Sequence, residues 1–405
     1  MTKAPAHLGI DLLSGTFFGR EPHDAYAWMR ANAPVYYDEA NDLWAAASYA
    51  AVKQASVDTE SFSSAQGIRP KLPQLPMMID FDAPEHVRRR RLVSEGFTPK
   101  RVRAMEANLH HVCDSIIDRV CEKGSCDFVA DIAAPLPIIV IGDMLGVAAG
   151  DRDDLLRWSD DMLKSLGSPD PTQMDAATAA FVEYTEYINP VFEDRRRRKA
   201  SDDLVGVLCH AEIDGDSLDA DSLIYETLLI LIGGDETTRH VISGGVEELL
   251  AHPDQVARLA ADSELIPGAV EEMLRWVSPI KNMARCATRD VELEGVTITA
   301  GQELILLYPS ANRDETVFEH PDAFDIGRHP NPHIAFGFGA HFCLGNQLAR
   351  LELKVMVERL LARLPDIHLS VDRTDLPRRQ ANFISGFEEM PVSFSPSSPV
   401  VAGPV

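Results

Sequence analysis

One stretch of the chain decides its fold: Phe336-Gly337-Phe338-Gly339-Ala340-His341-Phe342-Cys343-Leu344-Gly345. It holds a single cysteine, Cys343, between glycines. Because Gly339 and Gly345 lack a Cβ and can take positive φ values, we expect the backbone to turn tightly here beneath a flat group. Phe336 adds a flat apolar cover. The stretch therefore predicts a cysteine sulfur presented to a flat cofactor.

The predicted surroundings of Cys343 favour a thiolate. Residues 344–353 continue with helical spacing, so the positive end of a helix dipole is directed at the sulfur. A lone thiolate held in this way is typical of a haem iron ligand. Two other interpretations are a small buried apolar side chain and a zinc site of His333, His341 and Cys343. The zinc site lacks a close ligand pair and a fourth ligand, and the flanking glycines argue against the buried side chain.

Length and composition predict one large unit. The chain has 405 residues, 45% of them hydrophobic, without a linker, low-complexity tract or internal repeat between residues 10 and 395. We therefore expect a single domain over 1–405, with flexible tails at about 1–14 and 396–405. A net charge of -25 argues against nucleic acid as a partner.

Apolar stretches and cysteines indicate the compartment. The longest apolar runs, near 137–141 and 228–232, are too short to span a bilayer, and the N-terminus lacks a signal-peptide pattern. We therefore expect a cytoplasmic protein without a membrane span. The six cysteines have no disulfide-framework spacing, which fits a reducing compartment: Cys113, Cys121, Cys126, Cys209, Cys286 and Cys343.

Hydrophobic periodicity predicts a mainly α protein with a small β part. A hairpin is predicted where Val291–Leu293 and Val296–Ile298 flank Glu294-Gly295. Asp219 is a plausible start for the longest helix. Helices are predicted over 23–33, 45–57, 99–121, 151–166, 173–198 and 220–252.

A second motif lies inside that longest helix. Gly233 and Gly234 are adjacent, and a glycine in a helix interior costs about 1 kcal/mol relative to alanine, which suggests a functional reason. Without side chains there, another molecule could approach the backbone, while Thr237 could divert a carbonyl from the helical ladder. Glu236 and Thr237 would then stand at a groove. Taken alone, the motif also fits a solvated Glu236 and a merely tolerated Thr237.

A third motif is an ion pair three residues apart. Glu272 and Arg275 share one face of a predicted helix that Pro267 opens. A buried pair needs further donors and acceptors, and Arg328 is the candidate third member. The pair is expected to be buried because its neighbours are apolar: Val270, Met273, Leu274 and Trp276.

From about residue 15 to residue 395 the chain resembles a bacterial cytochrome P450. The cysteine stretch, the Gly233–Thr238 segment, the Glu-x-x-Arg pair with its third member and the segment Asp82–Arg91 carry the resemblance. It implies a mainly α fold with a large helical domain and a smaller β-rich part. Haem would lie between the long oxygen-binding helix and the helix after the cysteine.

The resemblance also implies roles for single residues. Cys343 would be the axial thiolate ligand of haem b and would favour O–O cleavage. Thr237 and Glu236 would be catalytic, with Thr237 bonding to dioxygen and Glu236 relaying protons from water. Buried propionates need cations and hydrogen-bond donors. The residues implied to contact the haem are His86, Arg90, Arg285, Phe336, Gly337 and His341.

Electron supply is implied by the same resemblance. Local basic patches border the expected proximal side of the haem in a chain that is otherwise acidic. A small acidic ferredoxin could dock there by charge complementarity, supplied by a ferredoxin reductase and NAD(P)H. The basic residues are Arg88, Arg89, Arg91, Lys100, Arg101, Arg103, Arg350 and Lys354.

The substrate pocket is expected to be apolar and to suit a bulky hydrophobic molecule. Segments 76–80, 228–240 and 271–276 are similar to actinobacterial steroid side-chain oxidases of cholesterol catabolism. This implies a cholest-4-en-3-one 26-monooxygenase, which hydroxylates a terminal methyl and could oxidise it further. The expected pocket residues are Met77, Met78, Ile230, Gly234, Val277, Phe383 and Ile384.

Other functions fit the same motifs. A monooxygenase of a terpene, fatty acid or macrolide would carry them equally well. A peroxygenase fits less well, because Glu236 and Thr237 suit dioxygen activation. Outside the enzymes, a haem-based sensor or carrier would bind gas or sterol without turnover. Electron-driven product formation separates these classes.

Overall fold

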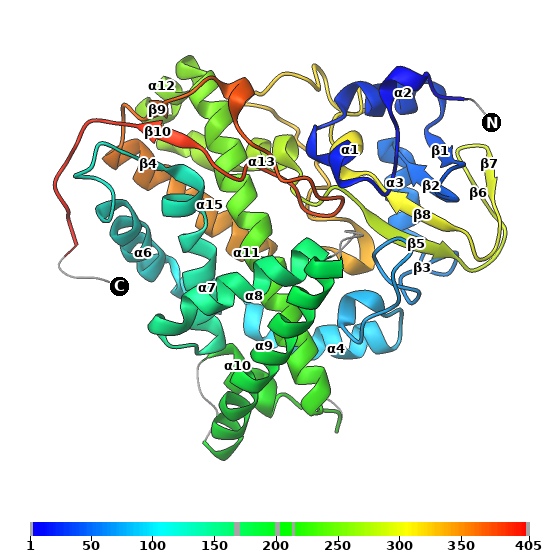
Figure 1. Cartoon of the computed structure of the whole chain (residues 1–405), viewed down its shortest axis with the longest axis horizontal. Coiled ribbons are helices and arrows are strands. Elements are labelled where there is room, and N and C mark those ends of the chain that lie inside the picture. Colours follow the sequence, from blue (N-terminus) through cyan, green and yellow to red (C-terminus); the bar gives the residue numbers. More distant parts are fainter. Residues whose placement is uncertain (1–2, 166–170, 199–202, 213–214, 402–405) are drawn as a thin grey trace.

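The computed structural model describes residues 3–165, 171–198, 203–212 and 215–401. Helices form the larger part of the molecule, and a sheet lies at one side beside the N-terminus (Figure 1). The helices are α1 (Gly15–Gly19), α2 (His23–Asn32), α3 (Tyr49–Val57), α4 (Glu85–Ser94), α5 (Pro99–Ala104), α6 (Glu106–Asp118), α7 (Pro135–Leu145), α8 (Arg152–Ser165), α9 (Pro171–Arg197), α10 (Leu204–His210), α11 (Ala220–Ala251), α12 (Pro253–Ala261), α13 (Ile266–Val277), α14 (Tyr308–Ala311) and α15 (Asn346–Arg363).

The strands form one larger sheet and two small ones. The larger sheet has the order β1-β2-β8-β5-β3, in which β2 and β8 are parallel and the other neighbours are antiparallel. The strands are β1 (Val35–Asp38), β2 (Leu43–Ala46), β3 (Phe62–Ser63), β4 (Ser125–Asp127), β5 (Met283–Ala287), β6 (Val291–Leu293), β7 (Val296–Ile298), β8 (Glu303–Leu306), β9 (His368–Leu369) and β10 (Pro391–Ser393).

Helix α11 crosses the middle of the molecule (Figure 1). The carboxylate of Asp219 caps its start by accepting the Ser222 N–H at 2.7 Å, as the sequence predicted. The helix ends at Ala251, and Pro253 opens α12. Helices α7, α8, α13 and α15 pack against α11 and enclose the largest apolar core. This core holds in place the helix that carries the glycine motif.

Two predicted helices differ from the structure. Residues 45 and 46, expected at the start of the helix over 45–57, belong to β2. The segment Leu43–Ala46 is buried on both faces, and a short apolar run does not distinguish a central strand from a helix. The helix predicted over 99–121 is divided into α5 and α6. The hairpin of β6 and β7 is confirmed, with Glu294 and Gly295 both at positive φ.

The described parts of the two expected tails pack on the body of the protein. Leu12 is fully buried, and its N–H donates to the Asp38 carboxylate at 3.0 Å. The backbone N–H groups of Val400 and Val401 donate to Asp118. The expectation of flexible tails at about 1–14 and 396–405 stays a prediction, and residues 1–2 and 402–405 lie outside the described part. No described helix is both long and apolar enough to cross a membrane.

Candidate functional site

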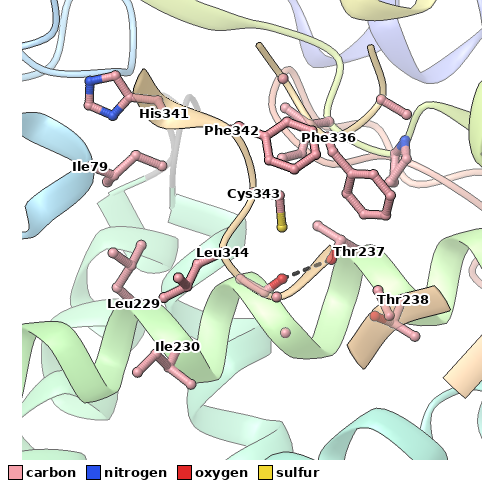
Figure 2. A pocket seen from close by; sticks show the side chains of 18 of the residues that line it. Ile79, Leu229, Ile230, Thr237, Thr238, Phe336, His341, Phe342, Cys343 and Leu344 are labelled. Carbon is pink, nitrogen blue, oxygen red and sulfur yellow. Dashed lines mark hydrogen bonds between the residues drawn. The ribbon is translucent and has the colours of Figure 1, made fainter. Parts of the chain in front are cut away.

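An apolar cavity separates the cysteine stretch from α11. Figure 2 shows the sulfur of Cys343 directed into this cavity, toward the turn of α11 that carries Thr237. Side chains from α11, β5, α15 and the segment before α4 complete the lining. The structure thus brings together the cysteine and glycine motifs, which lie about a hundred residues apart in the sequence.

The glycines of the cysteine stretch have distinct structural roles. Gly337 and Gly339 have φ values of 71° and 74°, which side chains rarely adopt. A Cβ on Gly339 would also lie 2.4 Å from the carbonyl oxygen of Ser56 in α3. Gly345 differs from the expectation, because its φ is -81°. No atom lies within 4 Å of the Cβ position of Gly345, so this residue leaves open space in the cavity wall.

Burial decides the electrostatics of Cys343 in the chain alone. It raises the pKa of the thiol, while the N–H of Gly345 and the charges of Arg90 and Arg350 act in the opposite direction. The expected helix does begin next to the cysteine, at Asn346. Because the pKa of the thiol is nevertheless raised, the dipole of this helix does not by itself produce a thiolate. A metal at the sulfur would, because coordination deprotonates a thiol.

Four groups that are cationic or can be protonated gather at one end of the cavity. The rings of His86 and His341 lie 4.1 Å apart, and Arg90 and Arg285 line the same wall. Burial, followed by the charges of Arg285, His86 and Arg90, lowers the pKa of His341 to about 2. Neither guanidinium is paired with a carboxylate in the described part of the chain. This donor set fits a cofactor with buried acidic groups.

The fit extends over the whole cavity. Haem needs an axial ligand, an apolar slot and partners for two carboxylates. The sulfur of Cys343, the open space at Gly345 and the cluster around Arg90 and Arg285 meet these three needs. Phe336 and Gly337 also line the slot. The guanidinium of Arg350 lies 4.6 Å from the centre of the Phe336 ring and fixes it from behind.

The glycine motif forms the opposite wall. The hydroxyl of Thr237 donates to the carbonyl of Gly233 at 2.8 Å, one turn earlier (Figure 2). A Cβ on Gly233 would meet no atom within 4 Å, so this glycine does open the wall. A Cβ on Gly234 would lie 2.6 Å from Cδ1 of Ile141. The close packing of α7 therefore also requires a glycine at position 234, which the sequence did not suggest.

Glu236 is not in the lining of this cavity. Its side chain is fully buried, and Arg239 and Arg379 both donate to its Oε1 atom. Arg239 also contacts Asp160 at 2.9 Å. Burial raises the pKa of Glu236 to about 7, although Arg239 and Arg379 oppose the shift. A carboxyl with such a pKa can both accept and release a proton near neutral pH.

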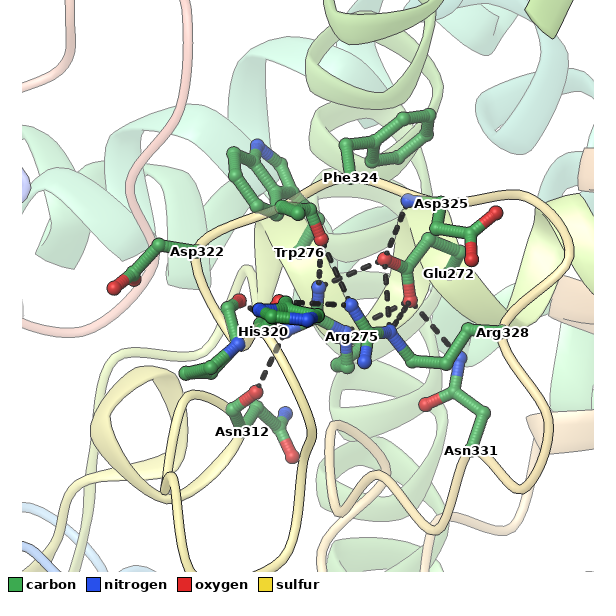
Figure 3. A network of polar contacts seen from close by, with 12 residues as sticks. Glu272, Arg275, Trp276, Asn312, His320, Asp322, Phe324, Asp325, Arg328 and Asn331 are labelled. Atoms are coloured by element: carbon green, nitrogen blue, oxygen red, sulfur yellow. Dashed lines mark hydrogen bonds and ion pairs between the residues drawn. The ribbon is translucent and has the colours of Figure 1, made fainter.

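The three members of the ion-pair motif form one buried network (Figure 3). The guanidinium of Arg275 donates twice to Glu272, at 2.8 and 2.7 Å, and Arg328 donates to the same carboxylate at 3.1 Å. Asn331 adds a further donor at 3.1 Å. Arg275 also donates to the carbonyls of Asn312 and Pro321. The network ties α13 to the chain that leads into the cysteine stretch.

The expected substrate residues divide into two groups. Met78, Ile230 and Gly234 line the cavity. The other four are buried outside its lining: Met77 in the helical core, Val277 against Gly244, Phe383 beneath the guanidinium of Arg69, and Ile384 beside the larger sheet. Residues beyond the end of α13 line the cavity instead: Pro279, Ile280 and Met283.

Several site residues gave no signal in the sequence. Arg379 and Asp160 reach the Glu236 network from distant segments, so only the fold brings them there. Glu352 on α15 also lines the cavity, and burial raises its pKa to about 8. Its place fewer than two turns into the helix that begins beside the cysteine could have suggested it.

The expected basic patch is partly neutralised. Arg88 and Arg89 both contact Glu85, and Arg89 also contacts the buried Glu226. Arg350 is paired with Glu271 and Lys354 with Glu106. The side chains of Lys100 and Arg103 are exposed.

Comparisons with known proteins agree with this geometry. The family model described as Cytochrome P450 matches residues 36–365. Two relatives named steroid C26-monooxygenase, from Mycobacterium tuberculosis and Mycolicibacterium smegmatis, are 54% and 52% identical. Each alignment covers 99% of this chain and 100% of the relative.

A solved structure is similar to the whole chain. It is a cytochrome P450 from Bacillus megaterium in complex with corticosterone, and it superposes with a TM-score of 0.84 at 32% identity. The match covers 93% of this chain and 98% of that chain. Fold and sequence therefore agree over nearly the whole length.

Proposed function

The chain belongs to the cytochrome P450 family, a family of haem-thiolate monooxygenases, and from that premise we propose that it hydroxylates the terminal methyl of the cholest-4-en-3-one side chain. The observation that carries the proposal is the identity of 54% and 52%, over nearly full length, to two steroid C26-monooxygenases. The apolar cavity supports it, because a sterol side chain offers few polar groups to bind.

The proposal assigns the cofactor contacts as follows. Cys343 would hold the iron of haem b through its sulfur, and His86, Arg90, Arg285 and His341 would hold the propionates. Their clustering at one end of the cavity supports this assignment. Phe336 and Gly337 lie against the macrocycle. When bound, haem b supplies the oxidising chemistry that uses O2 and two electrons.

The proposal gives the chain three tasks beyond holding the cofactor. The apolar lining excludes water and directs one end of the substrate to the wall that carries Thr237, opposite Cys343. The Thr237 hydroxyl donates its one proton to the Gly233 carbonyl, so it presents an acceptor oxygen at the wall opposite Cys343. Glu236, with a pKa near 7, stores and releases protons one residue away from Thr237. Further oxidation of the alcohol to aldehyde and acid would use the same groups.

The electron donor in this proposal is a ferredoxin, supplied by a ferredoxin reductase and NAD(P)H. Lys100 and Arg103, exposed on α5, support the docking of a small acidic protein. A cytoplasmic location is part of the proposal. It is supported by the six cysteines, none of which forms a disulfide in the structure.

Optical titration of the ferric protein tests the substrate. We expect cholest-4-en-3-one to shift the spin state of the haem at lower concentration than a fatty acid, a terpene or a macrolide. A spin-state shift by one of those ligands, without one by the steroid, would replace the steroid assignment with another monooxygenase substrate. Ligand-induced shifts without any electron-driven product would favour a sensor or carrier.

A further inference from the structure

Helix α11 separates two cavities of different character. One face, with Gly233, Thr237 and Val241, lines the apolar cavity at Cys343. Another face, with His240 and Gly244, lines a second and polar cavity of about 210 Å³. This volume is far larger than one water needs. Its other polar walls are Glu21, His23, Glu247, Glu248, Arg313, Asp322, Arg373, Arg378 and Ser385.

The polar cavity extends to the protein surface. The side chain of Asp322, which lines it, is 76% exposed, and that of Arg373 is 45% exposed. Arg373 is held at this opening by Glu247 and Glu248. The cavity is therefore open to solvent at this rim, and the helix α11 forms its inner wall.

His240 stands at that inner wall without a partner. Its ring is 2% exposed, and neither ring nitrogen has a hydrogen bond within the described residues. Buried polar groups without protein partners are usually satisfied by water. The backbone of Gly386 approaches so closely that a Cβ there would lie 2.3 Å from Nδ1 of His240. Any larger residue at position 386 would clash with the ring of His240.

The same ring reaches toward Glu236. Nε2 of His240 lies 3.9 Å from Oε2 of Glu236, just beyond a direct hydrogen bond. That Oε2 atom has no other partner in the described structure, whereas Oε1 is occupied by Arg239 and Arg379. A small side-chain rotation would bring the two groups into hydrogen-bond contact. The free carboxylate oxygen therefore points to the histidine and the polar cavity behind it.

We propose that His240 passes protons from water in the polar cavity to Glu236, and so supplies the protons that O2-driven turnover consumes. The inference rests on the proposed function of Glu236. In each transfer, a hydronium ion in the cavity gives a proton to one ring nitrogen and becomes water, and the other ring nitrogen gives its proton to Glu236. Rotation of the ring about its Cβ–Cγ bond then returns the remaining N–H to the side of Glu236, so that the next proton can follow. His240 acts through Glu236 and touches neither substrate nor cofactor.

The charges around His240 keep it in the form that the relay needs. Burial, followed by the charges of Arg239, Arg379, Lys281 and Arg378, lowers its pKa well below the usual value. A neutral imidazole has one donor and one acceptor nitrogen, so it can take up a proton on one side and release one on the other. Glu21 and Glu247 face the same cavity and partly balance these cations.

The test compares two ways of driving hydroxylation. With O2, hydroxylation of one C–H bond consumes two electrons and two protons and releases water. With hydrogen peroxide the oxidant already contains those electrons and protons. We expect His240→Phe to lower product formed per NAD(P)H by about tenfold, below the roughly hundredfold cost of losing a general acid. Peroxide-driven turnover and ligand-induced spectral shifts should stay as in the wild type.

Matched variants separate relay from structure. His111→Phe makes the same change on the exposed face of α6 and should leave coupling unchanged. His240→Gln keeps hydrogen bonding without a ring that exchanges protons, and it should also lose coupling and show a larger solvent isotope effect. Wild-type coupling in both His240 variants would overturn the relay. An equal loss in peroxide-driven turnover would also overturn it, because that result indicates a structural role.

The outcome is independent of the steroid assignment. The comparison uses whichever hydrophobic substrate the wild-type enzyme hydroxylates, so a different substrate leaves the test intact. A wild-type enzyme that hydroxylates other molecules but no steroid would overturn the substrate proposal alone. A coupled His240→Phe variant of a steroid hydroxylase would overturn the relay alone.

Discussion

Thr237 is the residue on which the chemistry of α11 depends most directly. Its hydroxyl bonds to the carbonyl of Gly233 and stands across the cavity from the sulfur of Cys343. The bond diverts that carbonyl from purely helical partners and fixes the direction of the hydroxyl. A hydroxyl oxygen fixed in advance as an acceptor loses little freedom when a reacting group arrives.

Thr237→Ala should uncouple electron use from product formation. Removal of the hydroxyl takes away this oriented polar group while the helix and the apolar wall remain, so haem content and ligand binding should not change. Product per NAD(P)H should fall roughly tenfold, measured by cofactor oxidation and product analysis. Thr237→Ser, which keeps the hydroxyl, is the control. Unchanged coupling in the alanine variant would remove Thr237 from the mechanism.

Local motifs made most of the site predictable at the level of single residues. Cys343, Thr237 and the cationic cluster lie around one cavity. They could be predicted because each belongs to a short segment with a recognisable spacing. Arg379, Asp160 and His240 were not predicted as site residues, because their roles depend on distant segments that meet only in the fold. The role of a buried side chain depends on its partners, and sequence spacing does not give those partners.

The adjacent glycines of α11 have different roles at the level of the element. Gly233→Ala should add a methyl to the cavity, weaken substrate binding severalfold and stabilise the helix by up to about 1 kcal/mol. Gly234→Ala should instead crowd Ile141 and lower the denaturation midpoint, and Ile141→Val should partly restore it. Optical titration and thermal denaturation of both variants check this. Equal effects at both positions would contradict the assignment.

Glu271 joins α13 to α15 behind the cysteine stretch. Its carboxylate contacts Arg350 at 2.6 Å and His333 at 2.9 Å, and it is 29% exposed. Burial alone would raise the pKa of Glu271, but the hydrogen bonds from His333 and Arg350 lower it from 4.5 to about 2. The lowered pKa means that this contact stabilises the fold above pH 4.5 and is lost as the pH falls through 2.

Glu271→Gln should therefore reduce the free energy of unfolding by about 1 to 2 kcal/mol at neutral pH, after allowance for solvent screening. The difference from the wild type should shrink as the pH falls below 4.5. Chemical denaturation at several pH values measures it. Glu264→Gln, in the short turn Ser263–Leu265, is the control and should have little effect. A difference that grows at low pH would show that the sign of the linkage is wrong.

Elements with a local chemical signal were predicted well, and those defined by tertiary context were not. The hairpin of β6 and β7 and the capped start of α11 follow from turn and cap residues. The strand Leu43–Ala46 was taken in part for a helix, because its identity depends on pairing with β1 and with the distant β8. Parallel pairing of β2 with β8 has no signature within the strand itself.

Charge has its effect at the scale of the whole molecule. A chain of net charge -25 should repel an acidic ferredoxin unless basic side chains concentrate on one face. The reduction rate by ferredoxin should therefore fall as salt is raised from low to physiological concentration. Stopped-flow measurements check this. Lys100→Ala and Arg103→Ala should weaken the dependence, and Lys164→Ala on α8 is a control. A rate independent of salt would exclude electrostatic steering.

Product analysis under isotopically labelled O2 tests the central claim most directly. The wild-type enzyme is supplied with cholest-4-en-3-one, ferredoxin, ferredoxin reductase and NAD(P)H, and the Cys343→Ser variant is the control. We predict a steroid product with one labelled oxygen on the terminal methyl carbon of the side chain, and none from the variant. A label at any other position, an unlabelled alcohol or no product would contradict the proposed terminal-methyl monooxygenase.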